Sequence, residues 1–203
     1  MGLFFWDVSS ATTFGSAFEG TTSLDPCNKK RSAFKLKGNA AFNSTGLFSL
    51  WNTETCHSEK GSTLTNDHRR SNILLAAWDW INFGSTVATE TWGDIEGWDT
   101  SRVTSLSALF SESRVGTNVR EWLGADLTKW DTGNAVSFEQ TFKGNSKFNG
   151  NMSTFQLQKT THLGEMFRGC ESFNGQLGTW DVSKVVDTNF MFKDASKFVS
   201  AKS

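Results

Sequence analysis

The chain has 203 residues, enough for one ordinary domain or two small ones with a sizeable buried core. Its formal net charge is −1 and its Lys and Arg residues are scattered, so it lacks the basic stripe expected of a protein that binds nucleic acid or anionic membranes. No apolar run is long enough to span a bilayer. The chain contains 18 Phe and 9 Trp but no Tyr, and many of these rings recur at fixed intervals.

Residues 1–56 are predicted to be the end of a first repeat array with a C-terminal cap. The array ends with one repeat, WDVSSATTFGSAF, which begins at Trp6. The apolar residues eight, twelve and eighteen positions after this Trp are Phe14, Phe18 and Leu24. From Cys27 onward the spacing is lost while aromatic residues persist, which is typical of a segment that closes the end of an array.

A linker and a helix are predicted next. Residues 57–70 are polar without periodic apolar residues, and we interpret them as a linker. Residues 71–83, SNILLAAWDWINF, form a predicted helix with Ser71 or Asn72 as its N-cap. Its apolar face would contain Leu74, Ala77, Trp78 and Ile81. Residues 71–203 are therefore predicted to be a capping helix and a second array, which we expect to be truncated because no cap follows Phe198.

The second array has a period of 25 residues. Trp130, Phe155 and Trp180 start three copies at this interval, and Trp98 starts an earlier copy with seven additional residues. We place those residues between Ser113 and Leu123, in a polar stretch where a loop can lengthen. Counting each start as position 0, Phe occupies position 12 in all four copies and position 18 in the last three. Units of this length must stack to bury their apolar faces, so the rings should form ladders that contribute about 1.5–3 kcal/mol per buried ring.

Each copy is predicted to contain a short strand, a helical turn and a return loop. RVTSL and KVVDT are β-branched and alternating, as in a brief strand. SALF and GEMF have apolar residues at helical spacing for one turn, and the Gly-, Asn- and Ser-rich returns are loops. The predicted fold class is therefore an α/β repeat, a leucine-rich-repeat-like solenoid of short parallel strands and short helical turns with an N-terminal capping helix on the second array.

Trp-Asp and Met-Phe pairs recur at fixed positions, as in WDVSKVVDTNFMFKDASKF from Trp180, and Phe-Asn pairs recur at Phe148 and Phe173, with Val199 in place of Asn in the last copy. With the 25-residue period and the predicted helix, they resemble the BspA-like leucine-rich-repeat surface proteins, in the branch whose repeats have no known function. The resemblance covers residues 71–198 well and residues 1–56 less well, and Phe155-Gln156 departs from the Trp-Asp pair. It implies a role in adhesion or partner binding at the cell surface or outside the cell. The opening residues show no secretory signal pattern, and a chain that begins inside a repeat is expected to be part of a longer protein.

An Asp follows the first Trp of four copies. These residues are Asp7, Asp99, Asp131 and Asp181. A stack of carboxylates could bind a cation through oxygen ligands. The alternative is an Asx turn, in which each carboxylate accepts backbone N–H bonds. We expect the turn, because Gln156 interrupts the row and no second acidic row accompanies it.

No catalytic, metal-binding or cofactor-binding motif is present in the sequence. His57, His68 and His162 are far apart, without metal-ligand spacing. No nucleophile elbow, phosphate loop or dinucleotide fingerprint occurs. We therefore expect no enzyme, no metal and no cofactor. An enzyme would need a pocket with convergent polar groups, for which residues 57–95 are the best candidate region.

Three Cys residues do not make a disulfide framework. Cys27 and Cys56 flank the proposed first cap and are a candidate disulfide, a pairing that the implied extracellular setting would permit. Cys170 occupies a repeat position that suits a small side chain. Asn43 and Asn151 begin Asn-x-Ser/Thr triplets, which are candidate N-glycosylation sites in a secreted eukaryotic protein and also occur by chance.

The leading functional hypothesis is a non-enzymatic recognition module at a cell surface. A solenoid presents a long face whose outward residues can bind extended partners, here a protein or a glycan rather than nucleic acid. Alternate strand positions should point away from the core. The predicted contact residues are Arg102, Thr104, Lys159, Thr161, Lys184 and Asp187. The alternative is a structural spacer of a cell wall or surface layer with no specific ligand.

Overall fold

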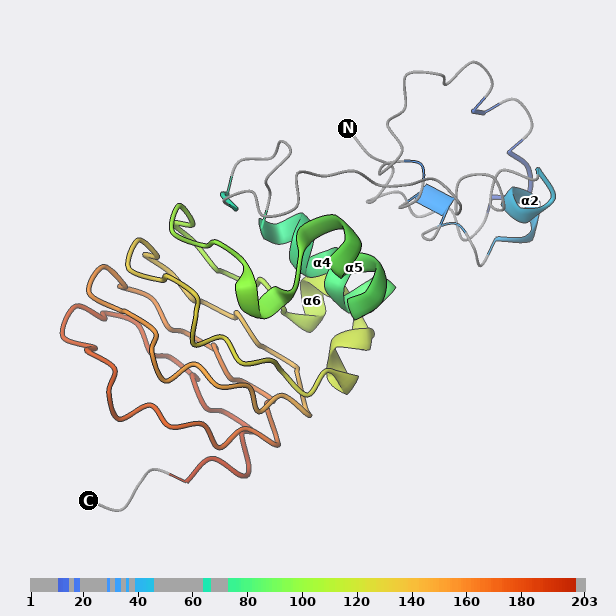
Figure 1. Cartoon of the computed structure of the whole chain (residues 1–203). Helices are drawn as coiled ribbons and strands as arrows, with labels where there is room; N and C mark the ends of the chain where they lie inside the picture. The colour runs from blue at the N-terminus through green and yellow to red at the C-terminus, as the bar shows by residue number, and fades with distance from the viewer. Residues whose placement is uncertain are drawn as a thin grey trace. The chain divides into compact units, whose positions relative to one another are not determined.

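The computed structural model describes residues 11–14, 17–18, 29, 32–33, 36, 39–45, 64–66 and 73–199 (Figure 1). The chain divides into two compact units, Met1–Ser58 and Glu59–Ser203. In the first unit, helix α2 (Ala40–Asn43) begins after Asn39, whose side-chain oxygen accepts a hydrogen bond from the Phe42 amide at 3.1 Å. Phe14 and Phe42 are buried there, with ring centroids 5.6 Å apart.

The second unit contains two helices and a 3-10 turn ahead of its repeats. These are α4 (Ile73–Phe83), α5 (Ser85–Trp92) and η2 (Ile95–Gly97). Gly84 separates α4 from α5 with a φ of 83°, a conformation that favours glycine. The fully buried apolar residues of α4 are Ile73, Ala76 and Ala77, while Leu74, Trp78 and Ile81 pack against the core with part of their surface exposed.

Residues 98–199 form a stack of coils, drawn in Figure 1 as parallel loops from green through yellow to red. Successive coils bond to each other through backbone groups at equivalent positions. The Phe138 N–H donates to the His162 carbonyl at 2.9 Å, and the Leu163 N–H donates to the Asp187 carbonyl at 2.8 Å. Isolated parallel bridges connect Ser105 with Ser137, Ser137 with His162, and His162 with Asp187.

The predicted strands do not occur among the described residues, so the strand-based leucine-rich-repeat solenoid is wrong. Each coil contributes single bridging residues, because the backbone soon leaves the extended region. At position 10, φ lies between 53° and 57° in Ala108, Gln140, Glu165 and Phe190. An extended run cannot continue through left-handed residues. Turns replace both the strand and the helical turn, as where the Leu109 N–H donates to the Leu106 carbonyl at 3.1 Å.

Two aromatic ladders run through the stack, and the predicted core is confirmed there. The first ladder consists of Phe110, Phe142, Phe167 and Phe192, and the second of Phe148, Phe173 and Phe198. Successive centroids are 5.6–5.8 Å apart in the first ladder and 5.7–6.0 Å apart in the second. Within a coil the two ladders also stack on each other, as in Phe142 and Phe148 at 4.1 Å. Only the rings of the last coil, Phe192 and Phe198, are partly exposed.

The additional residues of the first coil form helical turns, and not the predicted loop. They include α6 (Glu112–Val115) and the 3-10 helix η3 (Thr117–Glu121), which bury Val115 and Val119. Trp122 then lies with its ring centroid 5.4 Å from that of Phe148. It therefore takes the place that Phe occupies at position 18 of the later coils.

Candidate functional site

A row of side chains follows the stack at repeat positions 4 and 6, and we call it the lateral row. It consists of Arg102, Asn134, Lys159 and Lys184 at position 4, and of Thr104, Val136, Thr161 and Val186 at position 6. Contacts between coils run along it. The Lys159 Nζ donates to the Asn134 Oδ1 at 2.7 Å, and the Thr161 Oγ1 donates to the Val136 carbonyl at 3.3 Å.

Five of the six predicted contact residues lie on the lateral row. Four of them, Arg102, Thr104, Lys159 and Lys184, are exposed, and Thr161 is half-buried. Asp187 lies outside the row at position 7 and is half-buried. Its Oδ1 accepts the Asn189 N–H at 2.9 Å, and its Oδ2 lies so close to Gly164 that a Cβ there would be 2.8 Å away. The Asp187 carboxylate is therefore held against backbone.

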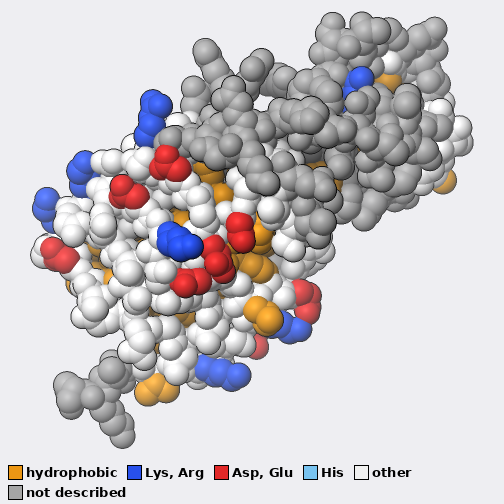
Figure 2. All heavy atoms as spheres, viewed as in Figure 1, with side chains coloured by type: hydrophobic (Ala, Val, Ile, Leu, Met, Phe, Trp, Pro, Cys, Tyr) orange, Lys and Arg blue, Asp and Glu red, His pale blue; other side chains and the backbone are white. Residues whose placement is uncertain are grey.

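Charges of both signs are interspersed on the face of the stack that Figure 2 shows. Glu165 pairs with Lys143 at 2.7 Å and with Arg168 at 2.6 Å. Hydrogen bonds from Lys143, and then from Arg168, lower the pKa of the Glu165 carboxyl to about 2. Such pairs neutralise one another locally, so the stack presents no single-sign stripe on this face.

The Asx-turn prediction is confirmed at the three Asp residues of this stack. The Oδ1 atoms of Asp99, Asp131 and Asp181 accept the N–H two residues ahead at 3.1, 3.0 and 3.0 Å. Hydrogen bonds from the Ser183 side chain and backbone lower the pKa of Asp181. Among the residues that the structure describes, no group of three or more His, Cys, Asp or Glu could hold a metal ion. Asp7 lies outside the described residues.

The other candidate residues are dispersed. Cys170 is a buried free thiol, and burial raises its pKa to about 12. Asn43 and Asn151 are both exposed, and His162 is exposed as well. The remaining candidates, Cys27, Cys56, His57 and His68, lie outside the described residues. No helix in the described part of the chain is long and apolar enough to cross a membrane.

One end of the stack is closed by Asn66, which imitates the backbone of a preceding coil. Its Oδ1 accepts the Thr104 and Ser105 N–H groups at 2.7 and 3.0 Å, and its Nδ2 donates to the Ser105 carbonyl at 2.6 Å. Between the last two coils, the Thr161 carbonyl accepts the equivalent N–H groups of Val186 and Asp187 at 2.9 and 3.2 Å. A single side-chain amide thus supplies bonds that a neighbouring coil would otherwise make.

Arg114 closes the same end further along the first coil. Its Nε donates to the Ala108 carbonyl at 2.8 Å, and its Nη2 donates to the Leu109 carbonyl. Its Nη1 reaches α4, donating to the Leu74 carbonyl at 3.0 Å. Burial lowers the pKa of the guanidinium to about 10. The Ala108 and Leu109 carbonyls of the first coil are therefore already occupied.

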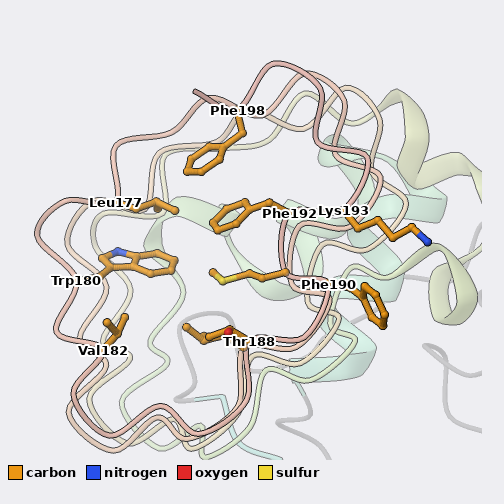
Figure 3. A pocket seen from close by; sticks show the side chains of 10 residues that line it. Leu177, Trp180, Val182, Thr188, Phe190, Phe192, Lys193 and Phe198 are labelled. Atoms are coloured by element: carbon orange, nitrogen blue, oxygen red, sulfur yellow. The ribbon is translucent and has the colours of Figure 1, made fainter. Parts of the chain in front are cut away.

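The opposite end of the stack is open and apolar, and we call it the end face. Its pocket of about 740 Å³ is lined by ten residues, and Figure 3 shows the rings of Trp180, Phe192 and Phe198 pointing into the space. The lining residues include Leu177, Trp180, Val182, Thr188, Phe192 and Phe198. Phe190 lies at its rim with 63% of its surface exposed. The sequence did not reveal this pocket.

These features define a repeat protein built from stacked coils with a 25-residue period, in which the described residues close one end of the stack and leave the other uncovered. Residues 81–203 match the family described as Mycoplasma protein of unknown function, DUF285. Because the match covers more than half of the chain, the protein belongs to this family. No curated protein and no solved structure matches the chain significantly.

Proposed function

We propose that the protein is a non-enzymatic recognition or adhesion module at a cell surface or outside the cell. It binds a protein or a glycan through the lateral row of its coil stack. The observation that carries this proposal is the exposure of Arg102, Lys159 and Lys184 at one repeat position of the first, third and fourth coils. A row of this kind repeats one contact at the spacing of the coils, which suits an extended ligand.

The chemistry of the row indicates what it would bind. Arg102, Lys159 and Lys184 carry positive charge, while the Thr104 and Thr161 hydroxyls beside them already donate to the Asn66 side chain and the Val136 carbonyl. Cations repeated along the row suit a ligand with repeated oxygen acceptors, such as an acidic peptide segment or a glycan. Exposed charges at such an interface mainly increase the association rate and the specificity for the ligand, and they add less to the affinity.

The family membership supports one part of this proposal, that the protein is a repeat protein of the kind found in this family. The Trp-Asp, Met-Phe and Phe-Asn positions resemble those of BspA-like surface proteins, and the matched family contains repeat proteins of unknown function. Placement in the BspA-like group, a surface location and adhesion are parts of the proposal.

The test is a binding screen of the full chain against cell-surface proteins and glycans. The row variant combines Lys159→Ala, Thr161→Ala and Lys184→Ala. The matched control combines Lys129→Ala and Lys147→Ala, which remove two exposed lysines from outside the row. Binding that the row variant loses and the control keeps, with both variants folded by circular dichroism, supports recognition. Equal binding by both variants contradicts the proposed surface, and no binding by any form favours the structural spacer.

A further inference from the structure

Among the described residues, no coil packs on the end face, whereas the next coil covers each inner coil. At position 2, Leu157 is 1% exposed, whereas Val182 in the last coil is 51% exposed. At position 8, Leu163 is buried and Thr188 is exposed. The same repeat positions therefore change from core to surface in the last coil, on which no other coil packs among the described residues.

The backbone of the last coil carries a matching set of free donors. Between each pair of inner coils, N–H groups at positions 8, 10, 12 and 14 donate to carbonyls at positions 7, 9, 11 and 13 of the next coil. In the last coil those positions are Thr188, Phe190, Phe192 and Asp194. Within the described residues, none of these four N–H groups has an acceptor. An occupant of the end face must therefore present carbonyl groups at every second residue.

This requirement excludes the two simplest pairings of the stack with itself. A second end face would bring donors against donors, leaving buried N–H groups unsatisfied. The opposite end of another stack has carbonyls at positions 7, 9, 11 and 13, but Asn66 already donates to that of Ser105, the Arg114 side chain to that of Leu109, and the Arg114 and Val115 N–H groups to that of Ser111. The occupant must come from elsewhere.

The chain contains one further copy of the repeat outside this stack, in residues 6–24. Trp6, Phe18 and Leu24 stand at positions 0, 12 and 18, where the last coil has Trp180, Phe192 and Phe198. The described part of this copy also makes the turn that every coil makes. The Ala17 N–H donates to the Phe14 carbonyl at 2.7 Å, at the positions where Met191 donates to Thr188 at 3.1 Å.

We propose that the end face binds residues 6–24 of a second copy of this chain as an additional coil. Phe18 would extend the first ladder above Phe192, and Leu24 would extend the second above Phe198. Thr13, Gly15, Ala17 and Glu19 have the sequence positions 7, 9, 11 and 13, so in such a coil their carbonyls would face the four donors. The contact joins two different surfaces, so it is head-to-tail and can propagate along a chain of molecules.

The first test is sedimentation velocity of the full chain over a range of concentrations. Wild-type protein should self-associate in a concentration-dependent manner. The end-face variant, Val182→Lys with Thr188→Lys, should weaken association at least about tenfold, because it places two charges in the centre of the contact. The matched control, Thr117→Lys with Leu123→Lys, adds the same charge at exposed positions of the first coil and should associate like wild type. Circular dichroism melting establishes that both variants are folded.

The second test identifies the occupant by lysine cross-linking of a mixture of 15N-labelled and unlabelled protein. We expect mixed-label cross-links between Lys193 or Lys197 of one molecule and Lys29 or Lys30 of another. Wild-type protein that stays monomeric, or an end-face variant that associates normally, would overturn the proposal. So would mixed-label cross-links confined to pairs of end-face lysines, or cross-links to Lys29 found only within single molecules.

Discussion

The Oδ1 atom of Asn66 lies 2.7 Å from the amide nitrogen of Thr104 and accepts its hydrogen bond. Asn66→Ala removes this acceptor and also the donor to the Ser105 carbonyl. Because both backbone groups then lack a partner at the end of the stack, we expect the free energy of unfolding to fall by about 1–2 kcal/mol. Urea denaturation followed by Trp fluorescence measures this change.

Asn66→Asp is the matched control for this position. It keeps an oxygen acceptor for the Thr104 and Ser105 N–H groups but places a second carboxylate oxygen, which cannot donate, against the Ser105 carbonyl, so it should also be less stable than wild type. Equal stability of all three proteins would show that Asn66 does not close the stack.

Phe142 lies at the centre of the aromatic ladders, so substituting it measures how much the ladders contribute to the free energy of unfolding. Its ring centroid is 5.8 Å from Phe110, 5.7 Å from Phe167 and 4.1 Å from Phe148. Phe142→Ala leaves a buried cavity and should destabilise the protein by about 3–5 kcal/mol. Phe198→Ala, in the partly exposed last coil, should lose less than half as much in the same denaturation experiment. Similar losses at both sites would contradict a core that is tightest in the inner coils.

The period and the ladders could be predicted from the sequence because rings at positions 12 and 18 contact their counterparts in neighbouring coils. The segments RVTSL and KVVDT alone could not show that the predicted strands are absent. Val103 and Leu106 are both buried, three residues apart, which is a turn spacing that β-branched composition conceals. The left-handed conformation of Ala108, Gln140, Glu165 and Phe190 also leaves no trace in composition, since none of them is Gly or Asn.

The surfaces were predictable to different degrees. Exposed polar residues in the repeats marked most of the lateral row before the structure was known. Asp187 was misplaced outward because the prediction assumed strand alternation, whereas its carboxylate accepts the Asn189 N–H. Closure of the stack by Asn66 and Arg114 depends on contacts that span 39 and 40 residues, to Ser105 and Leu74, and no local pattern encodes these pairings.

Ala108 tests whether the left-handed position 10 is strained. Its φ is 53°, a conformation that disfavours residues with a Cβ. Ala108→Gly should therefore stabilise the protein by about 0.5–1 kcal/mol. Ala125→Gly is the matched control, because Ala125 is not among the residues with positive φ and Gly there should destabilise by a similar amount. Thermal denaturation of both variants should give shifts of opposite sign, and a lower melting temperature for Ala108→Gly would contradict strain at position 10.

Glu165 should make the stability of the stack depend on pH. The hydrogen bonds from Lys143 and Arg168 lower the pKa of its carboxyl from 4.5 to about 2 in the folded protein. A carboxyl with a lowered folded-state pKa stabilises the fold above its unfolded pKa, and this contribution disappears as the pH falls through the folded value. Glu165→Gln should therefore destabilise the protein near neutral pH, by about 0.5–1 kcal/mol for a pair at the surface. The difference from wild type should shrink between pH 4.5 and about 2.

The matched control for this prediction is Glu139→Gln. Glu139 is exposed and makes no ion pair within the described residues, so its variant should follow the wild-type stability curve at every pH. Urea denaturation of the three proteins across this pH range separates the local pairing of Glu165 from the general effect of acid. A difference between wild type and Glu165→Gln that stays constant down to pH 2 would mean that packing of the Glu165 side chain, and not its charge, stabilises the stack.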